Sequence, residues 1–155
     1  MEMNFSDNEK EYVLQTIENY KDQIAKIPDD LDKIESVYEA LDIINNDNIS
    51  SMINKPSCKK GCSHCCYIQV AATQIEIDYI LNFLKDNNIQ LSENQLDRLK
   101  EQSKIDNNED YVLSIHRKCI FLSDEENCSI YEARPLTCRN YYVFNDPKLC
   151  NTFDT

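Results

Sequence analysis

Apolar residues near the start of the chain recur every three or four positions, which is the spacing of one face of an α-helix. The pattern covers residues 7–27 and stops at Pro28, which cannot continue a helix. Ser6 and Glu9 have the spacing of a capping box at its start. We therefore predict a helix whose apolar face is buried in a core. That face comprises Val13, Ile17, Tyr20, Ile24 and Ile27.

A second periodic stretch follows at once, and Asp29 or Asp30 is placed to cap its first turn. Together the two helices predict an acidic helical hairpin over residues 1–54, an N-terminal extension to the rest of the chain. Its apolar positions form either part of a core or an exposed groove for a protein partner. In the second helix they are Leu31, Ile34, Val37 or Tyr38, Leu41 and Ile44.

Two further helices are predicted by capping boxes in the middle of the chain. One box pairs Thr73 with Glu76, and the other pairs Ser92 with Gln95. After the second box, Leu96 and Leu99 are expected to mark a buried helix face. Residues 118–131 read as an apolar run, a polar turn and a second short apolar run, which predicts a β-hairpin.

Charge restricts the partners that this chain can have. Its 155 residues carry a net charge of -12, and residues 1–54 hold four lysines against thirteen acidic residues. This excess argues against nucleic acid or an anionic membrane as the main partner. No apolar run reaches the roughly 18 residues of a membrane-spanning helix. The first residues lack the apolar run of a secretory signal, so we expect a cytoplasmic protein.

Eight cysteines carry the candidate chemistry, and they fall in two groups. The first group lies within residues 58–66, the second is spread over residues 119–150, and the residues between contain no cysteine. A reducing cytoplasm disfavours disulfides, so metal ligation is the expected use of the thiols. We expect both groups to meet in one neighbourhood. The candidate ligands are Cys58, Cys62, Cys65, Cys66, Cys119, Cys128, Cys138 and Cys150.

Thiolates are soft ligands that suit Zn²⁺ and iron–sulfur clusters, and four sulfurs satisfy either. Gly61, the only glycine of the chain, directly precedes Cys62, so we predict a positive φ in a turn that bends around the metal. Because the adjacent Cys65 and Cys66 point in different directions, we expect at least six sulfurs to bind, on more than one ion. Nearby cations would favour the thiolate form. They are Lys59, Lys60, Arg117, Lys118, Arg134 and Arg139.

Other uses of the cysteines remain open at this point. A disulfide framework is one, although cysteine is sparser here than in typical disulfide scaffolds. A catalytic thiol is another, and only His64 and His116 are available as its base. Either histidine could also replace a cysteine as a metal ligand.

The first cysteine group, together with the segment CSIYEARPLTCRNY at residues 128–141, resembles a known family. This is the YkgJ-type cysteine-cluster family, also called the CxxCxxCC or zinc/iron-chelating domain family. The resemblance covers residues 56–150 and implies chelation of zinc or iron. The chain departs from the family pattern in having three residues, rather than two, between Cys58 and Cys62. A similar cluster occurs in flagellin lysine methylases, where the resemblance implies an iron–sulfur cluster.

The expected fold class is mainly α with a small β-hairpin (α+β). We expect a helical bundle around a cysteine-ligated metal site, with irregular loops near the metal and a cysteine-cluster domain over residues 55–155. The expected function is chelation of zinc or iron by thiolates. An iron–sulfur component of a redox or protein-modification system is one alternative, and a protein-interaction module with a structural zinc site is another. No substrate or reaction is specified by these residues.

Overall fold

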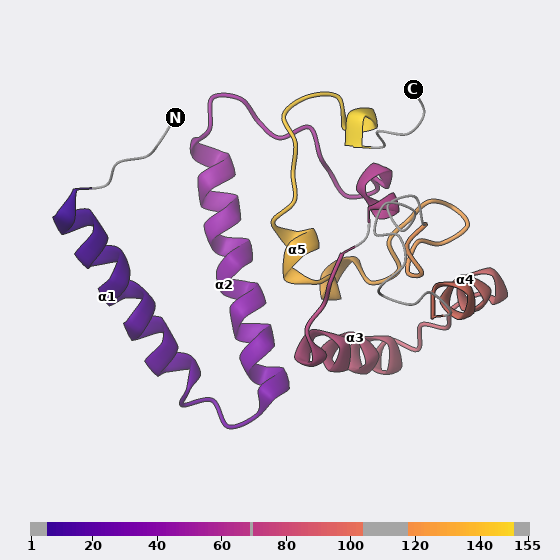
Figure 1. Cartoon of the computed structure of the whole chain (residues 1–155), viewed down its shortest axis with the longest axis horizontal. Helices are drawn as coiled ribbons and strands as arrows, with labels where there is room; N and C mark the ends of the chain where they lie inside the picture. Colours follow the sequence, from indigo (N-terminus) through magenta and orange to yellow (C-terminus); the bar gives the residue numbers. More distant parts are fainter. Residues whose placement is uncertain (1–5, 69, 104–117, 151–155) are drawn as a thin grey trace.

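The computed structural model describes residues 6–68, 70–103 and 118–150 of the chain, and helices are its regular elements (Figure 1). In this part of the chain no helix is long and apolar enough to span a membrane. The α-helices are α1 (Asp7–Ile24), α2 (Asp30–Ser51), α3 (Gln74–Asp86), α4 (Glu93–Ser103) and α5 (Leu136–Arg139). The 3₁₀ turns are η1 (His64–Tyr67), η3 (Tyr131–Ala133) and η4 (Pro147–Cys150).

The predicted helix starts are confirmed by their side-chain caps. The Ser6 hydroxyl accepts from the Glu9 amide, and the Glu9 carboxylate accepts from the Ser6 amide at 2.7 Å. The Asp29 carboxylate accepts from the first amides of α2, at 2.8 Å from Leu31. The helix ends differ from the prediction. Helix α1 ends at Ile24 instead of Ile27, and α2 continues to Ser51.

The prediction that the apolar face of α1 is part of a core is wrong. None of the α1 residues is buried, and Val13, Ile17 and Tyr12 are 45%, 45% and 73% exposed. Figure 1 shows α1 and α2 diverging from the loop that joins them, so α2 does not cover this face. The physical reason is that α2 places its own buried residues, Ile34 and Tyr38, toward the rest of the protein.

Helix α2 packs against the half of the chain that carries the cysteines. The rings of Tyr38 on α2 and Tyr79 on α3 meet edge to face, with centroids 5.3 Å apart. Arg139 of α5 makes a second contact with α2. Its guanidinium stands 4.0 Å from the Tyr38 ring centroid and donates to Asp42 at 2.7 Å. The domain boundary at residue 54 therefore stays a prediction, and α2 packs closely against residues that follow this boundary.

The apolar core lies between α3 and the loop of residues 121–133. Ile80 of α3 packs with Ile130 and Ala133, and partly buried neighbours surround them. These neighbours are Tyr79, Phe83, Leu84, Phe121 and Cys128. The second cysteine group thus borders the core directly, through Cys128.

Helix α4 is attached by polar side chains rather than by its leucines. Leu96 and Leu99, predicted to be buried, are 41% and 43% exposed. Gln95 is buried instead, and its amide donates to the Ile120 carbonyl at 2.9 Å. The predicted box is confirmed, because Gln95 also accepts from the Ser92 amide at 2.9 Å.

The predicted β-hairpin over residues 118–131 is not formed. The chain does reverse here, and Ser129 donates its amide to the Phe121 carbonyl at 2.8 Å. Within the described residues, however, only one isolated bridge joins the two sides, between Leu122 and Cys128. The Ile120 carbonyl accepts from Gln95 of α4, so it is not available to pair with a second strand.

One buried carboxylate, Glu76, joins three helices. As predicted it closes a capping box with Thr73, accepting from that amide at 2.7 Å. Its other oxygen accepts from the Leu136 amide at the start of α5, at 2.8 Å, and from the Tyr38 hydroxyl at 3.4 Å. Burial alone would raise the pKa of Glu76, but these hydrogen bonds outweigh it and lower the pKa below its ordinary value of 4.5.

We expect Glu76→Ala to lower the free energy of unfolding by about 3 kcal/mol, because it removes a cap and leaves buried donors unpaired. Since the pKa of Glu76 is depressed in the folded state, its ionised form stabilises the protein above about pH 4.5, and this contribution is lost as the pH falls through the folded pKa. Urea unfolding from pH 7 to pH 3 measures both effects. Glu76→Gln matches the shape and should lose this part of the pH dependence. Equal pH dependence in Glu76→Gln and the parent protein would contradict the assignment.

Candidate metal centre

The first cysteine group is built on a tight turn at Gly61. The Cys62 amide donates to the Lys59 carbonyl at 3.0 Å, and Gly61 has a φ of 91°. The predicted positive φ is therefore confirmed. A Cβ at this position would meet nothing closer than the Asn127 side chain at 4.0 Å, so glycine is needed for its conformation rather than for space.

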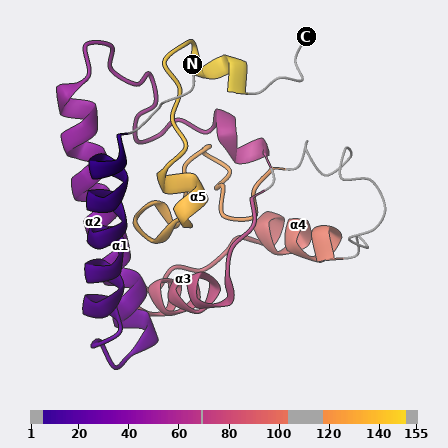
Figure 2. The same ribbon diagram turned by 60° about the vertical axis from the view of Figure 1, so that its left-hand side comes forward.

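The second cysteine group lies against the first. The amide of Cys119 donates to the carbonyl of Cys66 at 2.7 Å, which joins the two groups directly. The Val143 amide donates to the sulfur of Cys58 at 3.3 Å. Turn η1, which carries Cys65 and Cys66, lies against η4, which ends at Cys150 (Figures 1 and 2).

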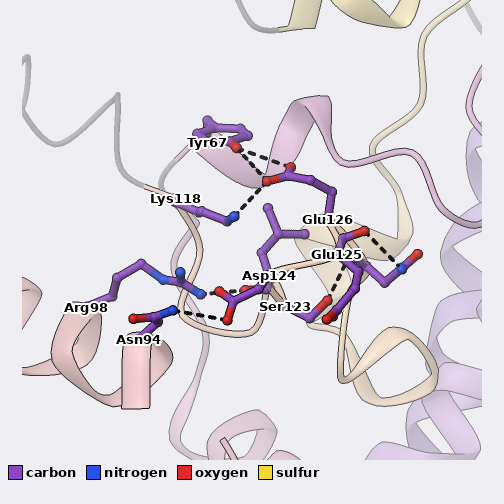
Figure 3. A network of polar contacts seen from close by, with 10 residues as sticks. Tyr67, Asn94, Arg98, Lys118, Ser123, Asp124, Glu125 and Glu126 are labelled. Carbon is purple, nitrogen blue, oxygen red and sulfur yellow. Dashed lines mark hydrogen bonds and ion pairs between the residues drawn. The ribbon is translucent and has the colours of Figure 1, made fainter. Parts of the chain in front are cut away.

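A polar network around Glu126 holds these segments together (Figure 3). Its carboxylate accepts from the Tyr67 hydroxyl at 3.2 Å and from the Lys118 ammonium at 2.6 Å. Tyr67 follows Cys66, and Lys118 precedes Cys119, so a single side chain ties the ends of both groups. Glu126 itself has a φ of 59°, which is unusual for a residue with a side chain. Sequence analysis missed this residue, because no motif marks it.

Burial and mutual contact set the protonation of the thiols. The pKa of the Cys65 thiol is lowered to about 6, and the main cause is a hydrogen bond with Cys66. The same hydrogen bond, followed by burial, raises the pKa of Cys66. Burial raises the pKa of Cys138 to about 12, and it also raises the pKa values of Cys119 and Cys128. The hydrogen bond thus favours the thiolate form of Cys65 and the thiol form of Cys66.

All eight cysteines are free thiols, and Cys150 is the most buried of them. As their side chains stand, no three Cys, His, Asp or Glu residues of the described ranges form a ready metal site. His64 lies on η1, beside Cys65. His116 and Arg117 lie outside the described residues. The structure therefore brings the backbones of the cysteine groups together, with Cys65 hydrogen-bonded to Cys66 and the Cys58 sulfur bonded to a backbone amide.

Comparison with known proteins supplies the family. The sequence model of the CxxCxxCC family, described as "Putative zinc- or iron-chelating domain", matches residues 57–153, more than half of the chain. The chain belongs to the CxxCxxCC family. The match contains all eight cysteines and excludes α1 and α2. No curated protein and no solved structure matches the chain.

The cations predicted to assist the thiols of this CxxCxxCC domain divide into two kinds. Three of them have carboxylate partners: Lys60 with Glu132 at 2.8 Å, Lys118 with Glu126 at 2.6 Å and Arg139 with Asp42 at 2.7 Å. Arg139 is buried and also donates to the carbonyls of Glu132 and Arg134, so it organises the local fold.

Lys59 and Arg134 have no carboxylate partner among the described residues, and Lys59 is exposed whereas Arg134 is half-buried. The Arg134 guanidinium stacks on the Tyr131 ring at 4.0 Å from the centroid. Its charge favours the thiolate forms of Cys65, Cys128 and Cys138. Arg98 on α4, which no sequence motif marks, has a similar influence on Cys119.

Proposed function

We propose that this protein binds zinc or iron through its cysteine thiolates, and that the centre holds more than one metal ion. One observation carries the proposal most strongly: the hydrogen bond from the Cys119 amide to the Cys66 carbonyl joins two cysteine groups that lie far apart in the sequence. Membership of a family described as zinc- or iron-chelating supports it.

The donors fit these metals. Eight soft sulfurs in partly or fully buried positions match the ligands that Zn²⁺ and iron–sulfur clusters prefer, and hard cations do not compete well for them. A bound metal would supply a cross-link between the loops that carry the sulfurs. For the chain, binding means exchanging the Cys65–Cys66 hydrogen bond for bonds to metal, with release of the thiol protons. The reducing cytoplasm is the compartment that keeps such thiols available.

Titration of the reduced, metal-free chain with Co²⁺ tests this function. Co²⁺ bound by thiolates has strong sulfur-to-cobalt charge-transfer bands in the near ultraviolet. Tetrahedral Co²⁺ also has absorption bands in the visible range. We expect both to appear and to be displaced by Zn²⁺. Chain whose thiols have been alkylated is the control and should show neither. Absence of sulfur charge-transfer bands in the unmodified chain would contradict the proposal.

The choice between zinc and an iron–sulfur cluster is decided by anaerobic purification. An iron–sulfur protein is brown, whereas a zinc protein is colourless. We propose zinc as the simpler structural use, because four thiolates alone complete a structural zinc site and no inorganic sulfide is needed.

A second candidate function rests on the exposed face of α1. Val13, Ile17 and Tyr20 lie on one face of α1, and they are 45%, 45% and 40% exposed although they are large apolar residues. Acidic residues flank them, and a separate cleft between α2 and α3 is also lined by carboxylates. These are Asp29, Asp32, Glu35 and Asp86. We propose that this face binds a basic amphipathic helix of another protein, because a second copy of this acidic chain would be repelled.

A labelled model peptide, amphipathic and rich in lysine, tests the α1 surface by fluorescence anisotropy. We expect binding that weakens with added salt and is lost in Ile17→Glu. The same peptide with glutamate in place of lysine is the control. Equal binding of both peptides, or concentration-dependent dimerisation of the chain in sedimentation, would overturn the assignment of a basic partner.

A further inference from the structure

Two buried arginine nitrogen atoms have no hydrogen-bond partner within the described part of the chain. Among the described residues, the buried side-chain nitrogen and oxygen atoms without a partner are the Nε atoms of Arg98 and Arg134. Buried polar groups in folded proteins nearly always have a partner, so each exception calls for an unseen acceptor. That both atoms belong to guanidinium groups next to thiols suggests a common acceptor.

Arg134 is fixed in place by its surroundings. It lies between η3 and α5, within the segment that joins Cys128 to Cys138. Its guanidinium stacks on Tyr131, and its backbone carbonyl accepts from Arg139 at 3.1 Å. Lys60 reaches the same ring from the solvent side, at 5.0 Å, but is 72% exposed and paired with Glu132. The exposed cation thus has an acid partner, and the inner one has none in the described part of the chain.

Arg98 approaches the cysteines from the opposite segment, helix α4. Its Nη2 donates to the carbonyl of Leu122. The amide of Leu122 in turn donates to the Cys119 carbonyl at 3.1 Å, and Leu122 forms the bridge to Cys128. Figure 3 shows Arg98 reaching from α4 toward the loop that carries Asp124. Arg98 therefore holds the turn between Cys119 and Cys128, and its Nε–H has no partner among the described residues.

We propose that Arg98 and Arg134 are the counter-ions of the thiolate metal centre, each donating its Nε–H to a metal-bound sulfur. The proposal rests on the proposed metal-binding function. Six thiolates on two Zn²⁺ ions leave two negative charges, and two guanidinium groups balance them. A buried site with uncompensated charge is unfavourable, so the arginines stabilise the loaded form specifically. Hydrogen bonds to charged acceptors are also stronger than neutral ones.

Zinc competition with a chromophoric chelator tests this proposal on the full chain. Substitution of a residue that hydrogen-bonds a metal ligand typically lowers metal affinity about 10- to 100-fold. We expect a loss of zinc affinity of this size in Arg134→Gln and in Arg98→Gln. Lys60→Gln is the matched control, because it removes the same charge from the solvent side of the same ring. Its affinity should change far less.

A spectroscopic readout separates a direct role from a merely structural one. In the Co²⁺-loaded chain, loss of an N–H donor raises the energy of the sulfur electrons, so the sulfur-to-cobalt band should move to longer wavelength in each arginine variant. If Arg134→Gln does not fold, Arg134→Lys tests the proposal instead, because it keeps the positive charge but lacks the Nε–H. This variant should show the shifted band and an intermediate zinc affinity. Unchanged affinity and an unchanged band would overturn the proposal. No metal uptake by the parent chain would instead overturn the proposed function on which it rests.

Discussion

Removing the metal is expected to unfold the part of the chain that carries the cysteines, residues 57–150. Structural zinc contributes on the order of 10 kcal/mol or more, which is comparable to the whole stability of a domain. The apolar core offers little to replace it. Among the described residues only seven apolar side chains are buried, and three of them, Ile80, Ile130 and Ala133, form a shared cluster.

The unfolding should extend to α2 but leave α1 unchanged. Helix α2 is held by contacts across the chain, between Tyr38 and Tyr79 and between Asp42 and Arg139. Helix α1 has no buried residue to lose. We expect chelation to abolish slow amide exchange in α2 and α3, and to reduce the helical circular dichroism.

Adding Zn²⁺ back to the chelated chain is the control for this experiment, and it should restore both signals. Alkylated chain should not recover. Thermal unfolding and circular dichroism that stay unchanged after complete chelation would show that the metal is not part of the fold.

Single Cys→Ser variants are expected to lower the metal content at six or more of the eight positions. A serine hydroxyl is a harder donor than a thiolate and is not ionised near neutral pH, so it replaces a sulfur ligand poorly. The adjacent Cys65 and Cys66 are central to this expectation. Both lie on η1, which contacts the backbone of Cys119 on one side and η4 with Cys150 on the other.

Cys→Ala variants at the same positions separate loss of a ligand from the polarity of serine. A spare buried thiol behaves as a small apolar residue, so at such a position alanine should be tolerated and full metal retained. One zinc per chain, with four of the eight variants fully loaded, would mean that a single four-sulfur site exists and the other thiols are spare.

The parts of the fold that depend on neighbouring residues could be predicted from the sequence. The three capping boxes and the positive φ of Gly61 are confirmed, because each is decided within a few residues. Asn88 also has a positive φ, as expected of an asparagine that serves where glycine is absent.

Predictions that depended on distant parts of the chain were less successful. An apolar stripe indicates which face of a helix can be buried. It does not indicate whether another element of the same chain packs against that face. No α1 residue is buried in this way, whereas α2 packs against α3. The hairpin at 118–131 was predicted from two apolar runs around a polar turn, but the Ile120 carbonyl accepts from Gln95 of α4 instead of from a second strand.

The candidate site shows the same limit. Cysteine spacing identified the ligand types, and the motif around Cys138 identified the family. The side chains that organise the site, Glu126 and Arg98, lie outside any spacing rule. Their roles come from contacts with residues more than twenty positions away, such as Tyr67 and Leu122.

The metal-to-protein ratio of the chain, purified without oxygen and measured by elemental analysis, tests the central claim most directly. The account predicts more than one zinc or iron per chain, with most thiols protected from alkylation until the metal is removed. A metal-free protein with eight freely reactive thiols, unable to take up either zinc or iron after reduction, would contradict it.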